Sequence, residues 1–389
     1  MPSVRQALEA DRATRTREAA VVVAYLSHFR APFYQALRSA FGAHGVDLKL
    51  LYGVTDGHFS RALDWAEPFP VRALPGGATW FPVLSRLARG ADVVVVEDAS
   101  RHLINYALLA LRKLGGPKLV LWGHGWNHQT SRPHSWAERI KKQVGRRADG
   151  FLAYTDGIRD ELIRRGYDAR RIHVVRNTIP RPAAPADLHQ VARLRARIGL
   201  APDAQVALYC GQIYPLKRVE LLIEAAALVK LELPRFELIL AGAGPKQSVC
   251  ERAAATHSFI HFIGPAFDDV KAACFALADV CAIPGVVGLS LVDAFHHGVP
   301  PIVTRMPTHG PEIDYLRDEV NGLETRHTAA DLAKSMARLL REEALRQRLI
   351  EGCRASSSEL GMEQMVDGFV DGVLATLGDE DVGGRLSYE

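Results

Sequence analysis

The sequence predicts an α/β protein built from two Rossmann-like domains, and three observations lead to this fold class. Short apolar segments alternate with helical segments along most of the chain, and strands such as Asp92–Glu97 are almost continuously apolar. Such runs are typical of parallel strands covered by helices on both faces. The alternation stops at a linker containing Pro180, Pro182 and Pro185 and then restarts. Finally, 389 residues suit two domains of ~150–200 residues each.

The first half is predicted to alternate strands and helices from Val21 onward. Residues 1–20 alternate arginine with acidic residues and lack an apolar stripe, so we expect a frayed helix or a disordered tail there. Residues 61–82 are rich in proline, glycine and aromatic residues, and we expect them to be irregular. The predicted strands are Val21–Leu26, Leu48–Tyr52, Asp92–Glu97, Lys118–Trp122, Gly150–Tyr154 and Ile172–Val175, and the predicted helices are Pro32–Ala43, Leu103–Leu114, Trp136–Arg147 and Asp156–Arg165.

The second half repeats the alternation and ends in consecutive helices. In open α/β sheets, ligands bind at the carboxyl ends of the strands, so loops of both halves are expected to face an interdomain cleft. The predicted strands are Gln205–Cys210, Phe236–Ala241, Phe259–Ile263, Asp279–Ile283 and Pro301–Thr304. The predicted helices are Val219–Lys230, Pro245–Ala255, Asp268–Leu277, Leu289–His297, Ala329–Leu340, Glu343–Ser356 and Met362–Leu377.

Composition indicates a cytoplasmic globular protein. Hydrophobic residues make up 48% of the chain, yet no run of 18 uncharged apolar residues and no secretion signal in the first 20 residues is present. The cysteines show no CxxC spacing and sit in apolar stretches, so we expect buried reduced thiols rather than a metal site. They are Cys210, Cys250, Cys274, Cys281 and Cys353.

Positive charge is concentrated in the first half. Residues 1–190 carry 28 lysines and arginines against 17 acidic residues, whereas the remainder carries 20 against 27. Such asymmetry attracts anionic surfaces. The densest cluster is either a solvated helix face or a docking site for anionic lipid head groups, at ~1 kcal/mol per basic residue. It comprises Arg139, Lys141, Lys142, Arg146 and Arg147.

Glycine loops follow the predicted strands of the second half. Gly211 comes directly after one strand, and Lys217, six residues on, could reach an anionic ligand over the strand ends. Gly242 and Gly244 follow the next strand, and Gly264 follows the one after that. Glycine lets a ligand or a neighbouring backbone approach closely. The GxGxxG pattern of dinucleotide-binding proteins is absent, which disfavours an NAD oxidoreductase.

The stretch from Pro284 to Thr304 predicts a phosphate site. Gly285 and Gly288 flank a turn that leads into a helix starting near Leu289. The first turn of a helix has unpaired amide donors and about half a positive charge, which suits a diphosphate. Asp293, one turn into this helix, could accept hydrogen bonds from ribose hydroxyls; the alternative is a solvated aspartate on the helix surface.

Together these motifs resemble family 4 retaining glycosyltransferases of the GT-B fold, over most of residues 20–375. The resemblance implies an acceptor-binding domain over 21–182, a nucleotide-sugar-binding domain over 190–360, and a helix over 361–378 that crosses back to the first domain. The motifs that carry it are Gly211 to Lys217, Ala241–Pro245, Phe262–Pro265, Pro284–Phe295, Glu312 with Asn321–Gly322, Leu121–Trp126, Ala153–Asp156 and Val175–Thr178.

The resemblance also implies roles for individual residues. Lys217 would pair with the donor diphosphate, and the amides of Gly288, Leu289 and Ser290 would hold its β-phosphate. Asp293 takes the position of the ribose-binding glutamate, and His124 lies on the loop that reaches the donor sugar. The predicted donor-binding set is Gly211, Gln212, Lys217, Gly242, Gly244, Gly264, Gly288, Leu289, Ser290, Asp293 and Glu312, with His124 and Lys217 as catalytic residues.

The chain departs from the family pattern at two positions. Gln212 stands where the family commonly has an arginine, and Gly285 stands where the family has the first glutamate of a Glu-x7-Glu motif. That glutamate usually holds the donor sugar. The chain instead has the variant PG-x-x-GL together with His309-Gly-Pro-Glu312, so Glu312 is expected to take over part of the sugar recognition.

A missing glutamate is compatible with retention if the leaving diphosphate itself deprotonates the acceptor. Positioning and electrostatic stabilisation are then the main tasks of the protein. No Asp-x-Asp occurs in a strand-end loop, so we expect no metal and no cofactor besides the nucleotide sugar. On the acceptor side, the candidates are His28, Arg30, Glu97 and Asp98.

The sequence therefore predicts a retaining glycosyltransferase that moves a hexose from a nucleotide-diphosphate sugar to a hydroxyl acceptor in polysaccharide or glycolipid assembly. The basic first half suggests a lipid-linked or anionic acceptor at the inner face of the cell membrane. Two alternatives stay open: a catalytically silent protein that binds nucleotide sugars, and a nucleotide-sugar epimerase. The base, the sugar and the linkage are left undetermined.

Overall fold

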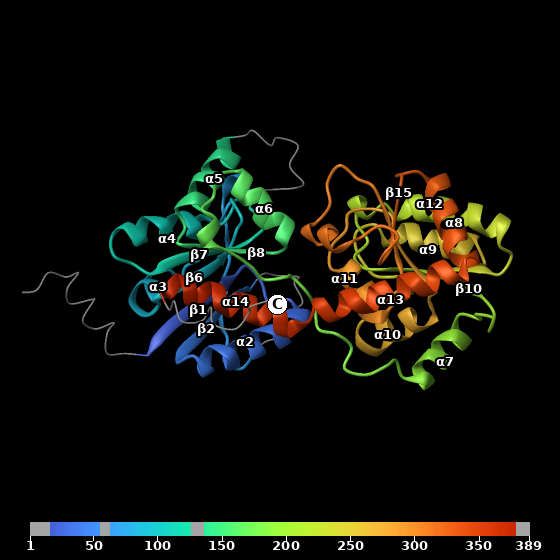
Figure 1. Ribbon diagram of the computed structural model, residues 1–389, viewed down its shortest axis with the longest axis horizontal. Helices are drawn as coiled ribbons and strands as arrows, with labels where there is room; N and C mark the ends of the chain where they lie inside the picture. Colours follow the sequence, from blue (N-terminus) through green and yellow to red (C-terminus); the bar gives the residue numbers. More distant parts are fainter. Residues whose placement is uncertain (1–15, 55–62, 126–135, 379–389) are drawn as a thin grey trace, which may run out of the picture. The chain divides into compact units, whose positions relative to one another are not determined.

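The computed structural model describes residues 16–54, 63–125 and 136–378, which form two compact units (Figure 1). The first unit takes Met1–Pro180 and Met362–Glu389, and the second takes Arg181–Gly361. Each unit contains a parallel sheet with helices on both faces, so the predicted fold class, GT-B, is confirmed.

The sheet of the first unit has seven parallel strands in the order β3-β2-β1-β6-β7-β8-β9. They are β1 (Arg17–Val23), β2 (Val46–Val54), β3 (Glu67–Pro70), β6 (Val93–Glu97), β7 (Lys118–Gly123), β8 (Gly150–Ala153) and β9 (Ile172–Val174), with a short hairpin of β4 (Arg72–Ala73) and β5 (Thr79–Trp80). The helices are α2 (Ala31–Ala43), α3 (Leu84–Gly90), α4 (Leu103–Lys113), α5 (Trp136–Arg147), α6 (Asp156–Arg164) and α14 (Met362–Leu377).

Alternate residues of β1 feed two separate apolar cores, one on each face of this sheet. Val21 packs in a core with Phe33 of α2 and Phe369 of α14, whereas Val22 packs in a core with Leu108 of α4 and Leu162 of α6. Side chains of a strand alternate between the two faces, so a strand buried on both sides must be apolar at every position. The observed cores explain why residues 19–23 of this strand are all apolar.

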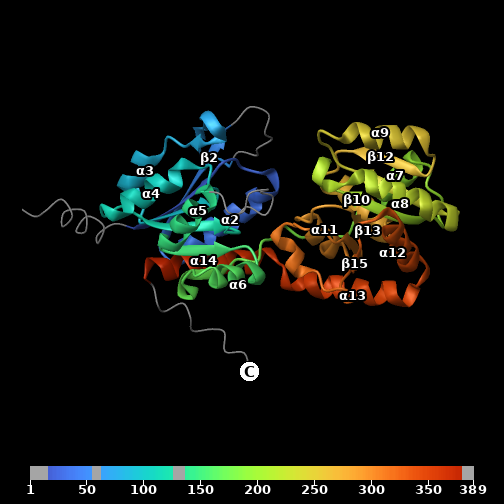
Figure 2. The same ribbon diagram turned by 90° about the horizontal axis from the view of Figure 1, so that it is seen from above.

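Helix α14 lies in the first unit although it follows the second unit in sequence (Figure 2). Two glycines let it approach β9 closely. A Cβ on Gly368 would lie 2.5 Å from the carbonyl oxygen of Val174, and a Cβ on Gly372 would lie 2.9 Å from Cβ of His173. Lys118 also donates from Nζ to the carbonyl oxygen of Thr376 at 2.7 Å. The helix is therefore an integral layer of the first unit.

The sheet of the second unit has six parallel strands in the order β12-β11-β10-β13-β14-β15. They are β10 (Gln205–Cys210), β11 (Phe236–Ala241), β12 (Ile260–Gly264), β13 (Val280–Ile283), β14 (Pro301–Thr304) and β15 (Leu323–Thr325). The helices are α7 (Leu188–Arg197), α8 (Val219–Glu232), α9 (Gln247–Thr256), α10 (Asp268–Leu277), α11 (Ser290–His297), α12 (Ala329–Arg341) and α13 (Glu343–Glu359).

Each sheet has a point where the strand order reverses direction, between β1 and β6 in the first unit and between β10 and β13 in the second. Loops on the two sides of such a point leave in opposite directions and open a crevice at the carboxyl ends of the strands, where ligands bind in open α/β sheets. In the second unit, the loops concerned follow Cys210 and Ile283. These are the loops that carry Lys217 and the Pro284–Gly288 turn.

The structure corrects the predicted elements in several places. Strand β1 begins at Arg17, within the expected tail, and residues 1–15 lie outside the described part of the chain. Residues 67–70 form the edge strand β3 and not an irregular segment. Its two prolines made it look unlike a strand in sequence, but proline is tolerated at sheet edges. Helices α3 and α7 and strand β15 were also not predicted. All five cysteines are buried and free, as expected.

Candidate functional site

The turn between β13 and α11 is held by hydrogen bonds to the loops on either side. Its Pro284 carbonyl accepts from Oγ1 of Thr304 on β14 at 2.8 Å. The amide of Val286 donates to the carbonyl of Leu216 at 3.0 Å, and its carbonyl accepts from Nζ of Lys217 at 2.7 Å. Both of the latter partners belong to the loop after β10. The turn is therefore fixed before any ligand arrives.

The next residue of the turn, Val287, is held from the other side. Its amide donates to Nδ1 of His309 at 3.1 Å, and its carbonyl accepts from the amide of Gly310 at 3.1 Å. Burial lowers the pKa of His309, which favours the neutral ring needed for Nδ1 to accept a hydrogen bond. Sequence reasoning placed His309 only in a motif; its contact with the turn links it to the site.

The amides of Gly288, Leu289 and Ser290 come next, at the start of α11. No hydrogen bond is found for these amides within the described residues, whereas the neighbouring amides of Val286 and Val287 are paired. The first turn of a helix also carries partial positive charge. The three predicted phosphate-binding amides are thus those that the turn leaves available.

Lys217 lies at the end of a one-turn 3-10 helix, Pro215–Lys217, and its side chain is only 9% exposed. Its Nζ contacts the Val286 carbonyl and lies 5.7 Å from the ring centroid of Tyr214. Burial lowers the pKa of Lys217 to about 8, and the buried carboxylate of Glu312 partly offsets this effect. A desolvated ammonium with further protons to donate suits an incoming diphosphate.

Glu312 lies beside this lysine, in a 3-10 helix over Pro311–Tyr315. It is 4% exposed and acts electrostatically on Lys217. Its Oε2 is so close to Gly310 that a Cβ there would lie 2.9 Å away. The structure thus places Glu312 as a counter-charge for Lys217. The predicted role in sugar recognition stays a prediction.

Gly285, the position where the family has a glutamate, is filled by backbone in this chain. A Cβ there would lie 2.2 Å from the carbonyl oxygen of Leu216 and 2.7 Å from Cα of Lys217. Side chains never approach backbone this closely, so the Lys217 loop can take its present path only if residue 285 is glycine. The lost glutamate and the position of Lys217 are therefore coupled features.

Asp293 is not the solvated surface aspartate that was the alternative to a ribose ligand. Its carboxylate is 19% exposed and accepts from Nζ of Lys271, on α10, at 2.6 Å. Burial raises the pKa of Asp293, and Lys271 lowers it. This pair was not predictable from sequence patterns, because the two residues belong to different helices.

Two of the strand-end glycines are required by contacts between backbones. Gly242 has φ +151°, and a Cβ there would lie 1.8 Å from the carbonyl oxygen of Gly211. Gly244 has φ +150° and faces the carbonyl oxygen of Ile213 at 2.4 Å. These two glycines let the β10 and β11 loops touch, and their expected role in donor binding stays a prediction. A Cβ on Gly264 would meet nothing within 4 Å and one on Gly211 would meet only Oη of Tyr209, at 3.9 Å, among the described residues; Gln212 is exposed.

On the first unit, Glu97 and Asp98 lie at the carboxyl end of β6, beside the strand-order reversal. Oε2 of Glu97 accepts from the amide of Ala24, just after β1, at 2.8 Å, and burial raises the pKa of Glu97. Asp98 is buried. Both predicted acceptor-side residues therefore lie where an open sheet binds ligands.

Arg30, the third acceptor-side candidate, contacts other residues of the first unit. Its guanidinium donates to the carbonyl of Thr178 at 3.1 Å and to Oδ1 of Asn177, and it lies 5.6 Å from the Trp122 ring centroid. These contacts give Arg30 a structural role within the first unit. The side chain of His28 lies outside the described part of the chain.

The ring of His124, directly after β7, is half-buried and lies 6.1 Å from that of Tyr154, at 88°. His124 belongs to the first unit and Lys217 to the second.

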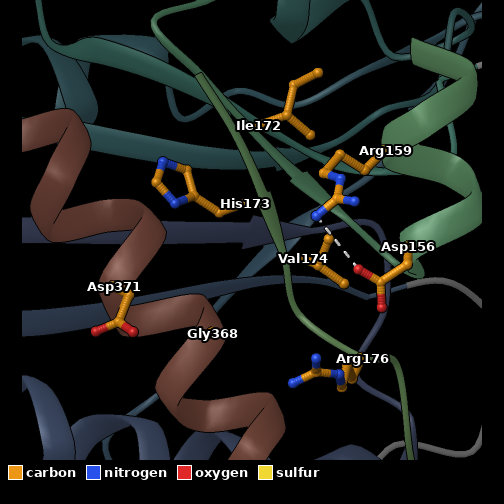
Figure 3. Close-up of a pocket in the computed structure, with 8 residues that line it drawn as sticks. All are labelled: Asp156, Arg159, Ile172, His173, Val174, Arg176, Gly368 and Asp371. Atoms are coloured by element: carbon orange, nitrogen blue, oxygen red, sulfur yellow. Dashed lines mark ion pairs between the residues drawn. The ribbon is translucent and has the colours of Figure 1, made fainter. Parts of the chain in front are cut away.

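A separate pocket of about 270 Å3 lies in the first unit and contains none of the predicted acceptor-side residues. Figure 3 shows Arg159 and Arg176 among its lining residues, with Asp156 3.5 Å from Arg159 and Asp371 contributed by α14. Two aspartates balance the two arginines, so this pocket offers no net charge to an anionic acceptor. Its lining is completed by Ile172, His173, Val174 and Gly368.

The described residues contain no group of three or more His, Cys, Asp and Glu side chains placed to hold a metal ion. None of the helices in those residues is long and apolar enough to cross a membrane. In the basic cluster, Arg146 donates to the carbonyls of Arg165 and Gly166, both at 2.9 Å. The side chains of Arg139 and Lys141 are not described.

Two parallel-sheet units with a last helix in the first unit are the layout of a GT-B protein, and two family models each match part of the chain. Residues 17–181 match the model described as Glycosyltransferase Family 4, and residues 204–342 match Glycosyl transferases group 1. The two models together account for most of the chain. The first half is therefore similar to glycosyltransferase family 4, and the second half is similar to the group 1 glycosyl transferases.

Among curated relatives, D-inositol 3-phosphate glycosyltransferase of Salinispora arenicola is 29% identical over 264 residues, covering 62% of this chain and 58% of the relative. The protein of the same name from Geodermatophilus obscurus is 30% identical over 260 residues, covering 61% and 55%. The match thus spans little more than half the length of these relatives.

Solved structures share the fold at low identity. HepE of Anabaena in complex with UDP and glucose has a TM-score of 0.69 and 15% identity, covering 92% of this chain and 99% of that chain. Sucrose-phosphate synthase of Thermosynechococcus elongatus has a TM-score of 0.71 and 15% identity, covering 94% and 100%.

Proposed function

We propose that this protein transfers a hexose from a nucleotide-diphosphate sugar to a hydroxyl acceptor with retention of anomeric configuration. One observation carries the proposal: the fixed turn at Pro284–Val287 presents, beside Lys217, the amides of Gly288, Leu289 and Ser290, which have no hydrogen-bond partner among the described residues. Such an arrangement suits a diphosphate. The names of relatives, all glycosyltransferases, and the UDP bound by HepE support it.

In the proposed reaction, the bond between the anomeric carbon and the diphosphate breaks as the acceptor oxygen bonds to the same face of the sugar. The acceptor proton passes to the leaving diphosphate. Negative charge grows on that group, and the α11 amides with Lys217 stabilise it without reorganising. No carboxylate nucleophile is needed, which agrees with the glycine at position 285.

Transfer and binding assays test the proposal and its alternatives. In a thermal-shift screen of UDP-, GDP- and dTDP-sugars, a ligand at 100 times its dissociation constant adds ~2.7 kcal/mol to the free energy of unfolding. Nucleotide release that depends on acceptor supports transfer. Binding without release would indicate the silent protein, and a new sugar isomer without acceptor would indicate the epimerase. Absence of any shift would contradict the proposed donor site.

For His124, we propose a contact with the donor sugar. Replacement of His124 by alanine should then lower turnover more than it weakens nucleotide binding, because the nucleotide site lies on the other unit. Turnover and the dissociation constant of the nucleotide would both be measured. An equal loss of both, with a lower melting temperature, would instead indicate a folding defect in the first unit.

We further propose that the acceptor is lipid-linked or otherwise anionic and that the protein acts in polysaccharide or glycolipid assembly at the inner membrane face. The support is the excess of basic residues in the first half. Vesicles with 30% anionic lipid should sediment more protein than neutral vesicles at low salt. Equal sedimentation with both would remove the membrane part of the proposal.

A further inference from the structure

The carboxylate of Asp293 is held at one oxygen and open at the other. Oδ1 accepts from Nζ of Lys271 at 2.6 Å, whereas Oδ2 has no hydrogen-bond partner among the described residues. Asp293 lies in the first turn of α11, and Lys271 lies on α10. Two helices that flank the strand-order reversal thus fix a single carboxylate.

The pair lies close to β10 and β13, as its electrostatic effects on their cysteines show. Asp293 acts electrostatically on the thiols of Cys210, the last residue of β10, and Cys281, in β13. Lys271 acts on His297, whose ring stacks on Phe275 at 4.3 Å. Burial keeps these cysteines and His297 uncharged near pH 7, so Lys271 is the cation that faces Asp293. The pair therefore lies beside the turn that holds the proposed diphosphate.

We propose that Lys271 is a positioning residue for donor recognition: it fixes Asp293 so that Oδ2 accepts hydrogen bonds from the ribose hydroxyls of the nucleotide. This inference rests on the proposed function. An aspartate is one methylene shorter than a glutamate, so it reaches less far and gains more from an exact orientation. A protonated carboxyl group would accept less well, and a half-buried aspartate without Lys271 takes up a proton more readily.

The test compares the dissociation constants of UDP and its 2′,3′-dideoxy analogue by calorimetry, or of the GDP pair if the nucleotide screen selects guanine. Wild type should bind UDP at least tenfold more tightly than the analogue. In Lys271→Met and Asp293→Asn the ratio should fall to about two, with the affinity for the analogue nearly unchanged. Lys271→Arg should retain the ratio, since it retains the cation.

The pH dependence separates positioning from a simple structural role. Acidification should abolish the preference for UDP over the analogue once Asp293 is protonated. In Lys271→Met this loss should occur at a higher pH than in wild type, because Asp293 no longer has the cation that lowers its pKa. Lys334→Met, on the exposed side of α12, serves as control and should behave as wild type.

Two results would overturn the inference: an unchanged ratio in Lys271→Met, or an equal loss of affinity for both nucleotides. If wild type bound none of these nucleotides, the proposed function itself would fail. That outcome differs from the two results above, in which wild type still binds nucleotide.

Discussion

Replacement of Lys217 by alanine should reduce turnover by roughly 30- to 1,000-fold, equivalent to ~2–4 kcal/mol of transition-state stabilisation. The ammonium is desolvated, lies beside the α11 amides and holds the Val286 carbonyl, so its loss removes a charge and loosens the turn. Single-turnover rates with saturating donor would measure the effect on chemistry. Lys246→Ala is the control, because the Lys246 side chain is exposed and its one partner among the described residues is Glu220, in a surface ion pair.

Wild-type turnover in Lys217→Ala would refute its role. A drop in melting temperature with full nucleotide binding would assign the residue to the fold instead. The Met variant, Lys217→Met, keeps most of the buried volume and helps to separate the two effects.

The same lysine predicts the alkaline side of the pH profile. Because the pKa of Lys217 in the free protein is about 8, kcat/KM should fall as pH rises through that value. Glu312→Gln removes the carboxylate that raises this pKa, so the fall should begin at lower pH. In Lys217→Arg the fall should vanish, since arginine keeps its proton.

The loss would not reflect alkaline unfolding through this group. Between about 8 and its ordinary value of 10.5, Lys217 binds fewer protons in the native state than in the unfolded state. The free energy of unfolding therefore rises with pH in that window as far as Lys217 is concerned. A melting temperature that tracked the rate would contradict this account.

Replacement of Gly285 by alanine should destabilise the second unit by ~1–3 kcal/mol or more, although only a methyl group is added. The new Cβ would lie 2.2 Å from the Leu216 carbonyl, and both partners are backbone. For a domain of this size the melting temperature should fall by about 2–4 °C per kcal/mol. Gly285→Glu, which restores the family residue, should be worse and should not raise activity.

Gly288→Ala is a matched control on the same turn. Its Cβ would meet only Nζ of Lys217, at 3.9 Å, so the fold should tolerate it. If Gly285→Ala melted like wild type, the loop of Lys217 would have room to move, and the coupling between residue 285 and Lys217 would be wrong.

Sequence patterns predicted most of the two sheets because buried parallel strands are apolar at every position. Helix α10 was predicted over Asp268–Leu277, where it is observed. Strand β3 was not predicted, because two of its four residues are proline. Strand β15, Leu-Glu-Thr, is too short to show a period. Helix α7 was not predicted, because it is strongly polar and directly follows the proline-containing linker, so it shows no clear apolar periodicity.

For the site, glycine and lysine positions along the chain were enough to indicate the turn and Lys217. The contacts that support them were not predictable, since they join residues far apart in sequence. Thr304 reaches Pro284 from the next strand, and Lys271 reaches Asp293 from another helix. Nothing in the order of residues indicates such pairs. Equally, a glycine required by a neighbouring backbone, such as Gly242, looks the same in sequence as one required by a ligand.

The return of α14 to the first unit limits how this protein can be recombined with its relatives. A hybrid made by joining the first half of one enzyme to everything after residue 181 of another would receive a foreign α14 against its own β9 and α2. The foreign helix would then match the surface of β9 closely, as Gly368 and Gly372 do here, only by chance. A working exchange should graft 181–361 alone, as an insert with two junctions, and leave the last helix with its native host.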